Sequence, residues 1–144
     1  MLAIGCDHGG YKLKEEIVAH LKKNGVDFKD FGTFDESSVD YPDIAKVVCE
    51  SIMSNECENG ILVCGTGIGI SIAANKHKGI RAAVCSDEFS TKFTRLHNDA
   101  NVLCLGGRVV GPGLACELVD IFLGTGFEGG RHSVRIQKIH DIEK

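Results

Sequence analysis

A cysteine beside a glycine-rich turn is the most chemically informative feature of this 144-residue sequence. Ile61–Val63 predict a buried strand, Cys64 stands at its end, and a helix can begin at Ile70. Backbone N–H groups of such a strand–helix turn can hold negative charge, and the same position favours the thiolate form of cysteine. Cys64 is therefore a candidate proton acceptor. The candidate anion-binding turn contains three glycines, Gly65, Gly67 and Gly69.

The turn is also compatible with simpler interpretations. Its glycine spacing is GxGxG rather than the GxGxxG of dinucleotide-binding folds, and no lysine–serine pair of a P-loop follows it. A tight connection from strand to helix would by itself require glycine. Thr66 places a hydroxyl two residues after the thiol, where it can orient a proton or serve as an ordinary turn residue.

Asp7 and His8 follow the first predicted strand and form a second candidate site. An Asp–His pair at a strand end can bind a hydroxyl and a phosphate, or act as acid and base. The alternative is structural: Asp7 caps a helix N-terminus and His8 is exposed beside it. The residue types alone do not decide between these interpretations.

Two further clusters contain arginine or histidine. Arg131 and Arg135 are four residues apart, so on a helix they share a face that suits a phosphate dianion. A solvated basic helix face is the alternative for this pair. His97 and Asn98 end another predicted helix, where they either cap the helix or face a cleft.

Short apolar runs alternate with amphipathic segments along the whole chain. Strands are expected at 2–5, 26–31, 60–63, 80–85 and 102–105, and helices at 11–24, 42–55, 70–76, 87–97, 112–123 and 131–142. In the first helix, apolar residues line one face and the lysines and glutamates lie opposite. The alternation predicts an α/β fold: a three-layer α/β/α Rossmann-like domain with a five-stranded parallel sheet. Its carboxyl edge should collect the polar residues that follow several strands.

Composition and charge limit the possible functions. A net charge of −4 argues against dedicated nucleic-acid binding, and no apolar run approaches the roughly 20 residues of a membrane span. The first strand begins so early that it leaves no room for a signal peptide. Seven cysteines without a CxxC pair are typical of reduced thiols in a cytoplasmic protein, and no pair has the usual spacing of zinc ligands. We expect one domain that spans residues 1–144.

Five segments in chain order carry a family resemblance. They are GCDHGGYKLK (Gly5–Lys14), DYPDIA (Asp40–Ala45), ILVCGTGIGISIAANK (Ile61–Lys76), RLHNDANVLCLGGR (Arg95–Arg108) and EGGRHSVR (Glu128–Arg135). Together they resemble the type B ribose-5-phosphate isomerases, a family that includes the galactose-6-phosphate isomerase subunits. The resemblance covers almost the whole chain. It implies a Rossmann-like fold and reversible interconversion of ribose 5-phosphate and ribulose 5-phosphate, in the non-oxidative pentose phosphate pathway.

The resemblance also implies an assembly and a set of catalytic residues. It implies a homodimer, sometimes a tetramer, with active sites shared between chains and the C-terminal helix in the dimer contacts. No metal and no organic cofactor are needed. Cys64 moves a proton between C2 and C1 of the sugar, with Thr66 beside it. His97 assists opening of the furanose ring, and Asp7 hydrogen-bonds sugar hydroxyls.

The remaining implied roles concern binding. The amides of the Gly65–Gly69 loop, together with Asn98, stabilise the enediolate, and Tyr41 lines the sugar pocket. His8 contributes to the phosphate site. The resemblance adds three arginines to that site, Arg131, Arg135 and, by way of the partner chain, Arg108.

The chain lacks a carboxylate that some family members use, and parts of the sequence are compatible with other functions. Some members use a glutamate a few residues after the strand end, whereas Ser71–Lys76 contains no carboxylate, so this chain fits the cysteine branch. Galactose-6-phosphate isomerase subunits divide their catalytic residues between two chains, and the full set here favours a self-sufficient enzyme. A six-carbon phosphosugar such as allose 6-phosphate is an alternative substrate. A nucleotide-binding module leaves the arginines and His97 unexplained, and a thiol-redox protein lacks a CxxC partner for Cys64.

Overall fold

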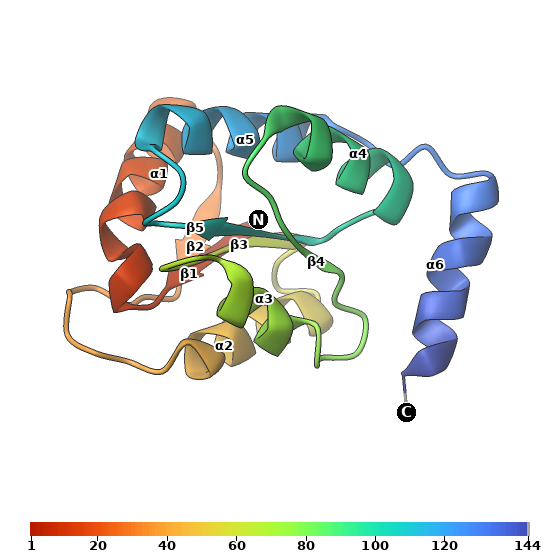
Figure 1. Cartoon of the computed structure of the whole chain (residues 1–144), viewed down its shortest axis with the longest axis horizontal. Helices are drawn as coiled ribbons and strands as arrows, with labels where there is room; N and C mark the ends of the chain where they lie inside the picture. Colours follow the sequence, from red (N-terminus) through yellow and green to blue (C-terminus); the bar gives the residue numbers. More distant parts are fainter. Residues whose placement is uncertain (144) are drawn as a thin grey trace.

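The computed structural model describes residues 1–143 and contains a five-stranded, fully parallel sheet (Figure 1). The strands are β1 (Leu2–Cys6), β2 (Phe28–Asp30), β3 (Asn59–Cys64), β4 (Ala82–Val84) and β5 (Val102–Gly106), in the spatial order β2-β1-β3-β5-β4. The expected fold class is therefore confirmed. The two edge strands, β2 and β4, are three residues shorter than the runs that predicted them, because each pairs on one side only.

Helices cover both faces of the sheet. They are α1 (Tyr11–Lys23), α2 (Tyr41–Met53), α3 (Ile68–Ala74), α4 (Glu88–Asn98), α5 (Pro112–Gly124) and α6 (Arg131–Ile142), with a short 3-10 helix η1 (His8–Gly10) before α1. Figure 1 shows α1, α4 and α5 on one face and α2 and α3 on the other, while α6 stands apart beside the sheet. All six expected helices form, and α3 begins two residues earlier than predicted.

Two apolar cores lie on either side of the sheet, because successive strand residues point to opposite faces. In β5, Leu103 and Leu105 pack with α1 and α5, whereas Val102 and Cys104 pack with α2 and α3. All seven cysteines are free, and six of them are buried. Among residues 1–143, no helix combines the length and the apolar character needed to cross a bilayer.

The expectation that every lysine of α1 faces solvent is wrong for Lys14, whose side chain is fully buried. Its Nζ donates to both carboxylate oxygens of Asp30 at 2.9 Å and to the Thr33 carbonyl at 2.6 Å. These acceptors lie at and beyond the end of β2, so the sequence of α1 alone could not reveal them. The ammonium thus fastens this connection to α1, and the Thr33 N–H fastens it to the end of β1 by donating to the Cys6 carbonyl oxygen at 2.8 Å.

We predict that Lys14→Met lowers the free energy of unfolding by about 3 kcal/mol, because it leaves the Asp30 carboxylate without its cation. Urea denaturation provides the measurement. Lys12→Met is the matched control, since the Lys12 side chain is 87% exposed and its loss should change stability by less than about 0.5 kcal/mol. Equal effects of the two substitutions would show that the buried pair contributes nothing to stability.

Candidate functional site

The loops that follow β1, β3 and β5 meet at the carboxyl edge of the sheet. The Asp7 N–H donates to the Val63 carbonyl at 3.1 Å, the Gly107 N–H to the Cys64 carbonyl at 2.8 Å, and the Arg108 N–H to the Gly65 carbonyl at 3.0 Å. The three loops therefore form one hydrogen-bonded unit. The expected convergence of polar residues at this edge is confirmed for these loops.

Close backbone approach explains why glycine is needed where the loops touch. A Cβ on Gly107 would lie 2.7 Å from the Gly9 carbonyl oxygen, and one on Gly106 would lie 2.7 Å from the Thr66 backbone. Both distances are shorter than a carbon atom tolerates, and backbone atoms cannot rotate away as a side chain can. The absence of side chains at these positions therefore allows the three strand ends to pack together.

The Cys64 thiol is held against the glycine-rich turn. Cys64 is 4% exposed, and its Sγ accepts a hydrogen bond from the Gly67 N–H at 3.1 Å. Gly67 has φ of 79°, a left-handed conformation that glycine adopts without strain. The Ile68 N–H donates to Thr66 Oγ1 at 3.2 Å, so two N–H groups are already used within the turn. Gly69 lies in the first turn of α3, where N–H groups have no partner inside the helix.

Burial changes the electrostatics of five cysteines outside this turn. Burial raises the pKa of Cys6 and of Cys49 to about 12, and burial also raises the pKa values of Cys85, Cys104 and Cys116. These thiols stay protonated at neutral pH and act as small apolar side chains. The expectation that Cys85 and Cys104 are core residues is confirmed, since both are buried.

His8 and Arg108 line a pocket of about 430 Å³ at the carboxyl edge, together with Gly9, Lys12 and Gly107. His8 Nδ1 accepts a hydrogen bond from the Val39 N–H at 3.3 Å, which favours the tautomer with its proton on Nε2. Glu36 also lines this pocket, and its carboxylate lies 3.7 Å from the Lys12 ammonium. The Arg108 guanidinium and the His8 imidazole remain as a donor pair that suits a phosphate group.

Asp7 and Tyr41 lie at the same edge. The Asp7 carboxylate accepts a hydrogen bond from the Gly10 N–H at 3.1 Å, so the predicted capping role of Asp7 is confirmed. Asp7 is only 7% exposed. The Tyr41 ring packs on the glycine turn so closely that a Cβ on Gly69 would lie 2.8 Å from its Cζ atom. We call Asp7, His8, Cys64, Thr66 and Arg108 the carboxyl-edge group.

His97 and Asn98 lie at the opposite edge of the sheet. They end α4 just before β5, whose first residue, Val102, pairs with Gly60 at the start of β3. The Arg81 guanidinium fastens this helix end to the start of β4 by donating to the carbonyl oxygens of Asn98 and Asp99 at 2.8–3.1 Å. Since strands rise about 3.3 Å per residue, the five residues of β5 separate the two edges by roughly 15 Å.

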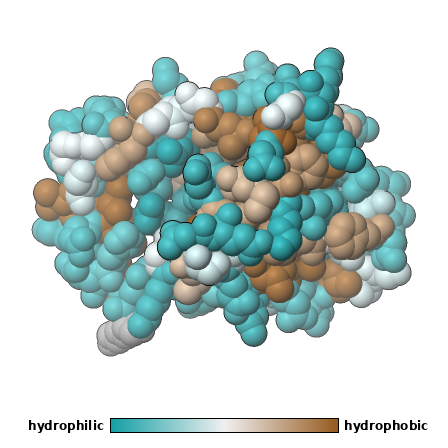
Figure 2. All heavy atoms as spheres, turned by 180° about the vertical axis from the view of Figure 1, so that it is seen from behind, coloured by the Kyte–Doolittle hydropathy of each residue, from teal (hydrophilic) through white to brown (hydrophobic). Residues whose placement is uncertain are grey.

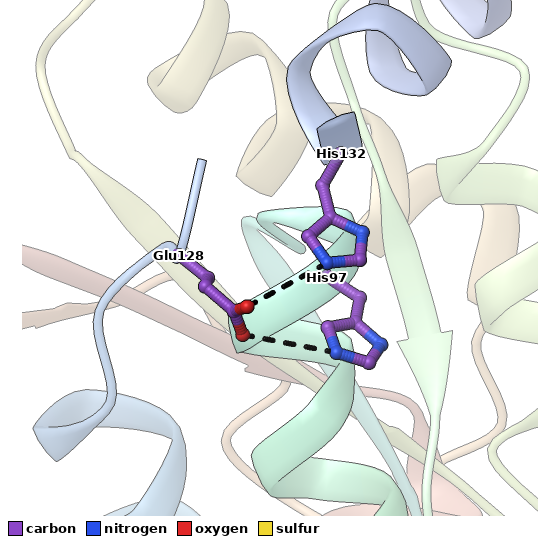
Figure 3. Close-up of side chains that lie close together, drawn as sticks. All are labelled: His97, Glu128 and His132. Atoms are coloured by element: carbon purple, nitrogen blue, oxygen red, sulfur yellow. Dashed lines mark ion pairs between the residues drawn. The ribbon is translucent and has the colours of Figure 1, made fainter. Parts of the chain in front are cut away.

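The N-terminus of α6 packs on His97. The His97 and His132 rings stack with centroids 4.2 Å apart, and Figure 3 shows both rings beside the Glu128 carboxylate. The nearest Nε2–carboxylate distances are 3.9 Å for each histidine. Burial is the largest cause that lowers the pKa of His132, and the neighbouring His97 is the second. Arg131 and Arg135 are exposed on the same helix.

The expected site residues therefore fall into two groups within one chain. The second group, which we call the helix-end group, contains His97, Asn98, Arg131 and Arg135. Sequence reasoning missed the contribution of Glu128 and the stacking of His132, because the contact between α4 and α6 leaves no local pattern. The four-residue spacing of Glu128 and His132 was the one available signal.

Comparison with known proteins places the chain in a family. Residues 2–139 match the family model described as Ribose/Galactose Isomerase. This chain belongs to the ribose/galactose isomerase family. It is 52% identical to ribose-5-phosphate isomerase B of Escherichia coli over 143 residues, which cover 99% of this chain and 96% of the relative.

Solved structures of family members have the same fold. Ribose-5-phosphate isomerase B of Clostridium thermocellum matches with a TM-score of 0.97 and 56% identity, over 99% of this chain and 96% of that one. The type B ribose 5-phosphate isomerase of Trypanosoma brucei matches with a TM-score of 0.93 and 46% identity, over 99% and 97% of the two chains.

The buried thiols predict a loss of stability at alkaline pH. Above a pKa of about 8.5 the unfolded chain releases thiol protons that the folded chain retains at Cys6 and Cys49, so unfolding becomes more favourable as pH rises toward 12. We predict that Cys49→Ala reduces the drop in unfolding free energy between pH 8 and pH 10 by about 2 kcal/mol.

Denaturant unfolding under a reductant at both pH values measures this drop. Cys116→Ala is the control, because Cys116 is only partly buried and should contribute less. The same pH dependence in wild type and Cys49→Ala would contradict the prediction. Lysine and tyrosine ionisation affects all three proteins alike and cancels in the comparison.

Proposed function

We propose that this protein interconverts D-ribose 5-phosphate and D-ribulose 5-phosphate by proton transfer through an enediolate. The observation that carries the proposal is the Cys64 thiol, which is buried against a glycine turn and lies at the same sheet edge as the cationic pocket of His8 and Arg108. Aldose–ketose isomerisation needs both parts, a base at the reacting carbons and a distant anchor for the phosphate. The relatives named as ribose-5-phosphate isomerase B support this substrate.

Cys64 is the proposed proton carrier. A thiolate at this position takes the proton from C2 of the open-chain aldose, which leaves an enediolate, and the thiol returns that proton to C1. The hydroxyl proton on the C2 oxygen passes to the C1 oxygen, which gives the ketose. The Gly67 N–H fixes the direction of Sγ, so the sulfur stays directed toward the turn. Thr66, which is exposed two residues after Cys64, is proposed to orient the proton as it moves between the carbons.

Preorganised donors are proposed to stabilise the enediolate. Negative charge develops on the substrate oxygen as the proton leaves, and fixed N–H groups stabilise that charge without reorganising. Gly69 supplies such a group, because it lies in the first turn of α3. Asp7 would accept hydrogen bonds from sugar hydroxyls, and Tyr41 would line the pocket beside the turn.

The phosphate is proposed to bind between His8 and Arg108 of one chain and the arginines of α6 from another. This assignment replaces the expectation that Arg108 comes from the partner chain, because Arg108 and His8 line one pocket of the same chain. Phosphate binding holds C1 and C2 at the thiol and contributes to the rate without taking part in the chemistry. Arg131 and Arg135 are exposed and share a helix face, so they are available to a partner chain.

We infer that the complete active site needs two copies of the chain. His97 is the proposed ring-opening acid–base group, and within one chain it lies at the sheet edge opposite to Cys64. A homodimer that brings the helix-end group of one chain to the carboxyl-edge group of the other resolves this separation. A dimer with two-fold symmetry would contain two such sites.

Exposed apolar side chains support association through α6. Val134 and Ile142 of this helix are 59% and 76% exposed. Figure 2 shows a hollow between the lobe formed by α6 and the rest of the molecule, and Ile139 and Ile142 line the pocket of about 640 Å³ there. An uncovered apolar surface of this kind is typical of a protein–protein contact. The reduced cysteines support a cytoplasmic location.

Conversion of ribose 5-phosphate by the purified protein, with a chelator present and allose 6-phosphate and galactose 6-phosphate as comparison substrates, tests the function. We expect chelator-insensitive turnover of the pentose. Turnover of a hexose alone would keep the chemistry and change the substrate, in line with the galactose named in the family description. Turnover of none of them would contradict the proposal.

Cys64→Ala should lower kcat by about 1,000-fold, because general-base catalysis typically contributes that much. Phosphosugar binding, measured by calorimetry, should be largely retained. Arg135→Ala is the contrasting variant: it should raise KM by about tenfold, as expected for the loss of one charged hydrogen bond, and affect kcat less. Near wild-type turnover in Cys64→Ala would remove Cys64 from the role of base.

Mixing inactive variants tests the shared site. Cys64→Ala and His97→Ala, unfolded together and refolded, should recover about one quarter of wild-type activity, since half of the dimers are mixed and each mixed dimer has one intact site. The control mixture, Cys64→Ala with Asp7→Asn, should recover none, because both substitutions lie in the same group. No recovery in the first mixture, with mixed dimers demonstrated by mass spectrometry, would mean that each chain builds its own site.

A further inference from the structure

We propose that His97, Glu128 and His132 form a binding site for a divalent transition-metal cation of the Zn²⁺ class, and that an ion bound there inhibits the isomerase. The inhibition rests on the proposed function of His97, whereas binding of the ion does not. Two imidazoles and one carboxylate are a common ligand set for such cations. The cysteine spacing considered above gives no indication of this site, because its ligands come from α4, α6 and the segment between α5 and α6.

The three ligand atoms are already gathered. His97 Nε2, His132 Nε2 and a Glu128 carboxylate oxygen lie within 4.8 Å of one another, and Figure 3 shows the Nε2 atoms of both rings directed toward the carboxylate. Two ligands bound to one tetrahedral zinc ion at about 2.1 Å lie about 3.4 Å apart. Each Nε2 lies 3.9 Å from the carboxylate, so the nitrogens need to approach the oxygens by about half an ångström. The stacked rings must also tilt, so that the lone pairs of both Nε2 atoms meet at one ion.

Within residues 1–143 the ligands lack better partners. His132 is 5% exposed, and its Nε2 atom has no hydrogen-bond partner. A buried ring nitrogen without a partner costs free energy, and 3.9 Å is too long for a hydrogen bond to Glu128. A cation between the rings and the carboxylate would satisfy the nitrogen and neutralise the acid. The Glu128 side chain is 55% exposed, so an ion can reach the site from solvent.

The surrounding backbone holds the ligands in place. The Glu128 N–H donates to the Leu96 carbonyl at 3.0 Å, which fastens Glu128 to α4 one residue before His97. Arg95 Nε donates to the Thr125 carbonyl at 3.0 Å and fixes the start of the same segment. Preorganisation of this kind reduces the entropy lost on binding.

Titration of Zn²⁺ and Co²⁺ into the metal-free protein, followed by calorimetry and by the visible spectrum of Co²⁺, tests the site. We expect one ion per chain, a Co²⁺ spectrum without the near-ultraviolet band of thiolate ligands, and no binding of Mg²⁺, which prefers oxygen ligands. In the wild type, Zn²⁺ should shift the imidazole NMR signals of His97 and His132 together. Isomerase activity should fall with the same concentration dependence and return when a chelator is added.

Glu128→Gln and His132→Asn should each weaken Zn²⁺ binding by about tenfold or more. Inhibition, measured relative to each variant's own rate without metal, should weaken by the same factor. Glu117→Gln and His140→Asn are matched controls outside the cluster and should bind Zn²⁺ as the wild type does. Absence of saturable binding, or equal binding in Glu128→Gln and the controls, would overturn the proposal. Binding without inhibition would confirm the site and instead remove His97 from the isomerase reaction.

Discussion

The parallel direction of β3 and β5 is the constraint on which the arrangement of functional residues depends. Cys64 ends β3 beside Gly106, so the thiol and Arg108 lie at the carboxyl edge of the sheet. The helix that leads into β5 must end at the other edge, and His97 lies at the end of that helix. A rotation of the His97 or Cys64 side chain cannot span the length of a strand, so the two residues of one chain cannot meet. The same sheet that gathers one group of residues therefore keeps the other group away.

Backbone packing, rather than side-chain packing, gives the carboxyl edge its shape. Three loops share hydrogen bonds, and the contacts of Gly106 and Gly107 leave no room for a Cβ. A site built in this way has little freedom to relax, which suits a reaction whose charge develops at fixed N–H groups. The buried Lys14–Asp30 pair extends this rigidity to the connection beyond β2, because its third hydrogen bond reaches the Thr33 carbonyl.

Sequence patterns predicted most of the fold. They also predicted where the carboxyl-edge group lies, because its residues directly follow predicted strands. Alternating apolar runs located all five strands and the six α-helices but not η1. The residues after β1, β3 and β5 were expected at one edge because parallel strands end together. The burial of Lys14 and the stacking of His132 on His97 could not be predicted, since each depends on contacts between elements distant in the chain. The bounds of β2 and β4 were also missed, because edge strands are limited by pairing rather than by composition.

The separation of the helix-end group from the carboxyl-edge group affects both catalysis and metal binding. If His97 completes the site only in a dimer, a single chain holds a thiol base without its ring-opening partner, and free sugar phosphates do not react there. Until a substrate engages His97, its nearest polar neighbours are the Glu128 carboxylate and the unpartnered nitrogen of His132. These are groups that a divalent cation of the Zn²⁺ class binds well. Sharing a histidine across an interface thus makes the same residue open to two ligands, and the phosphosugar and the metal should compete for it.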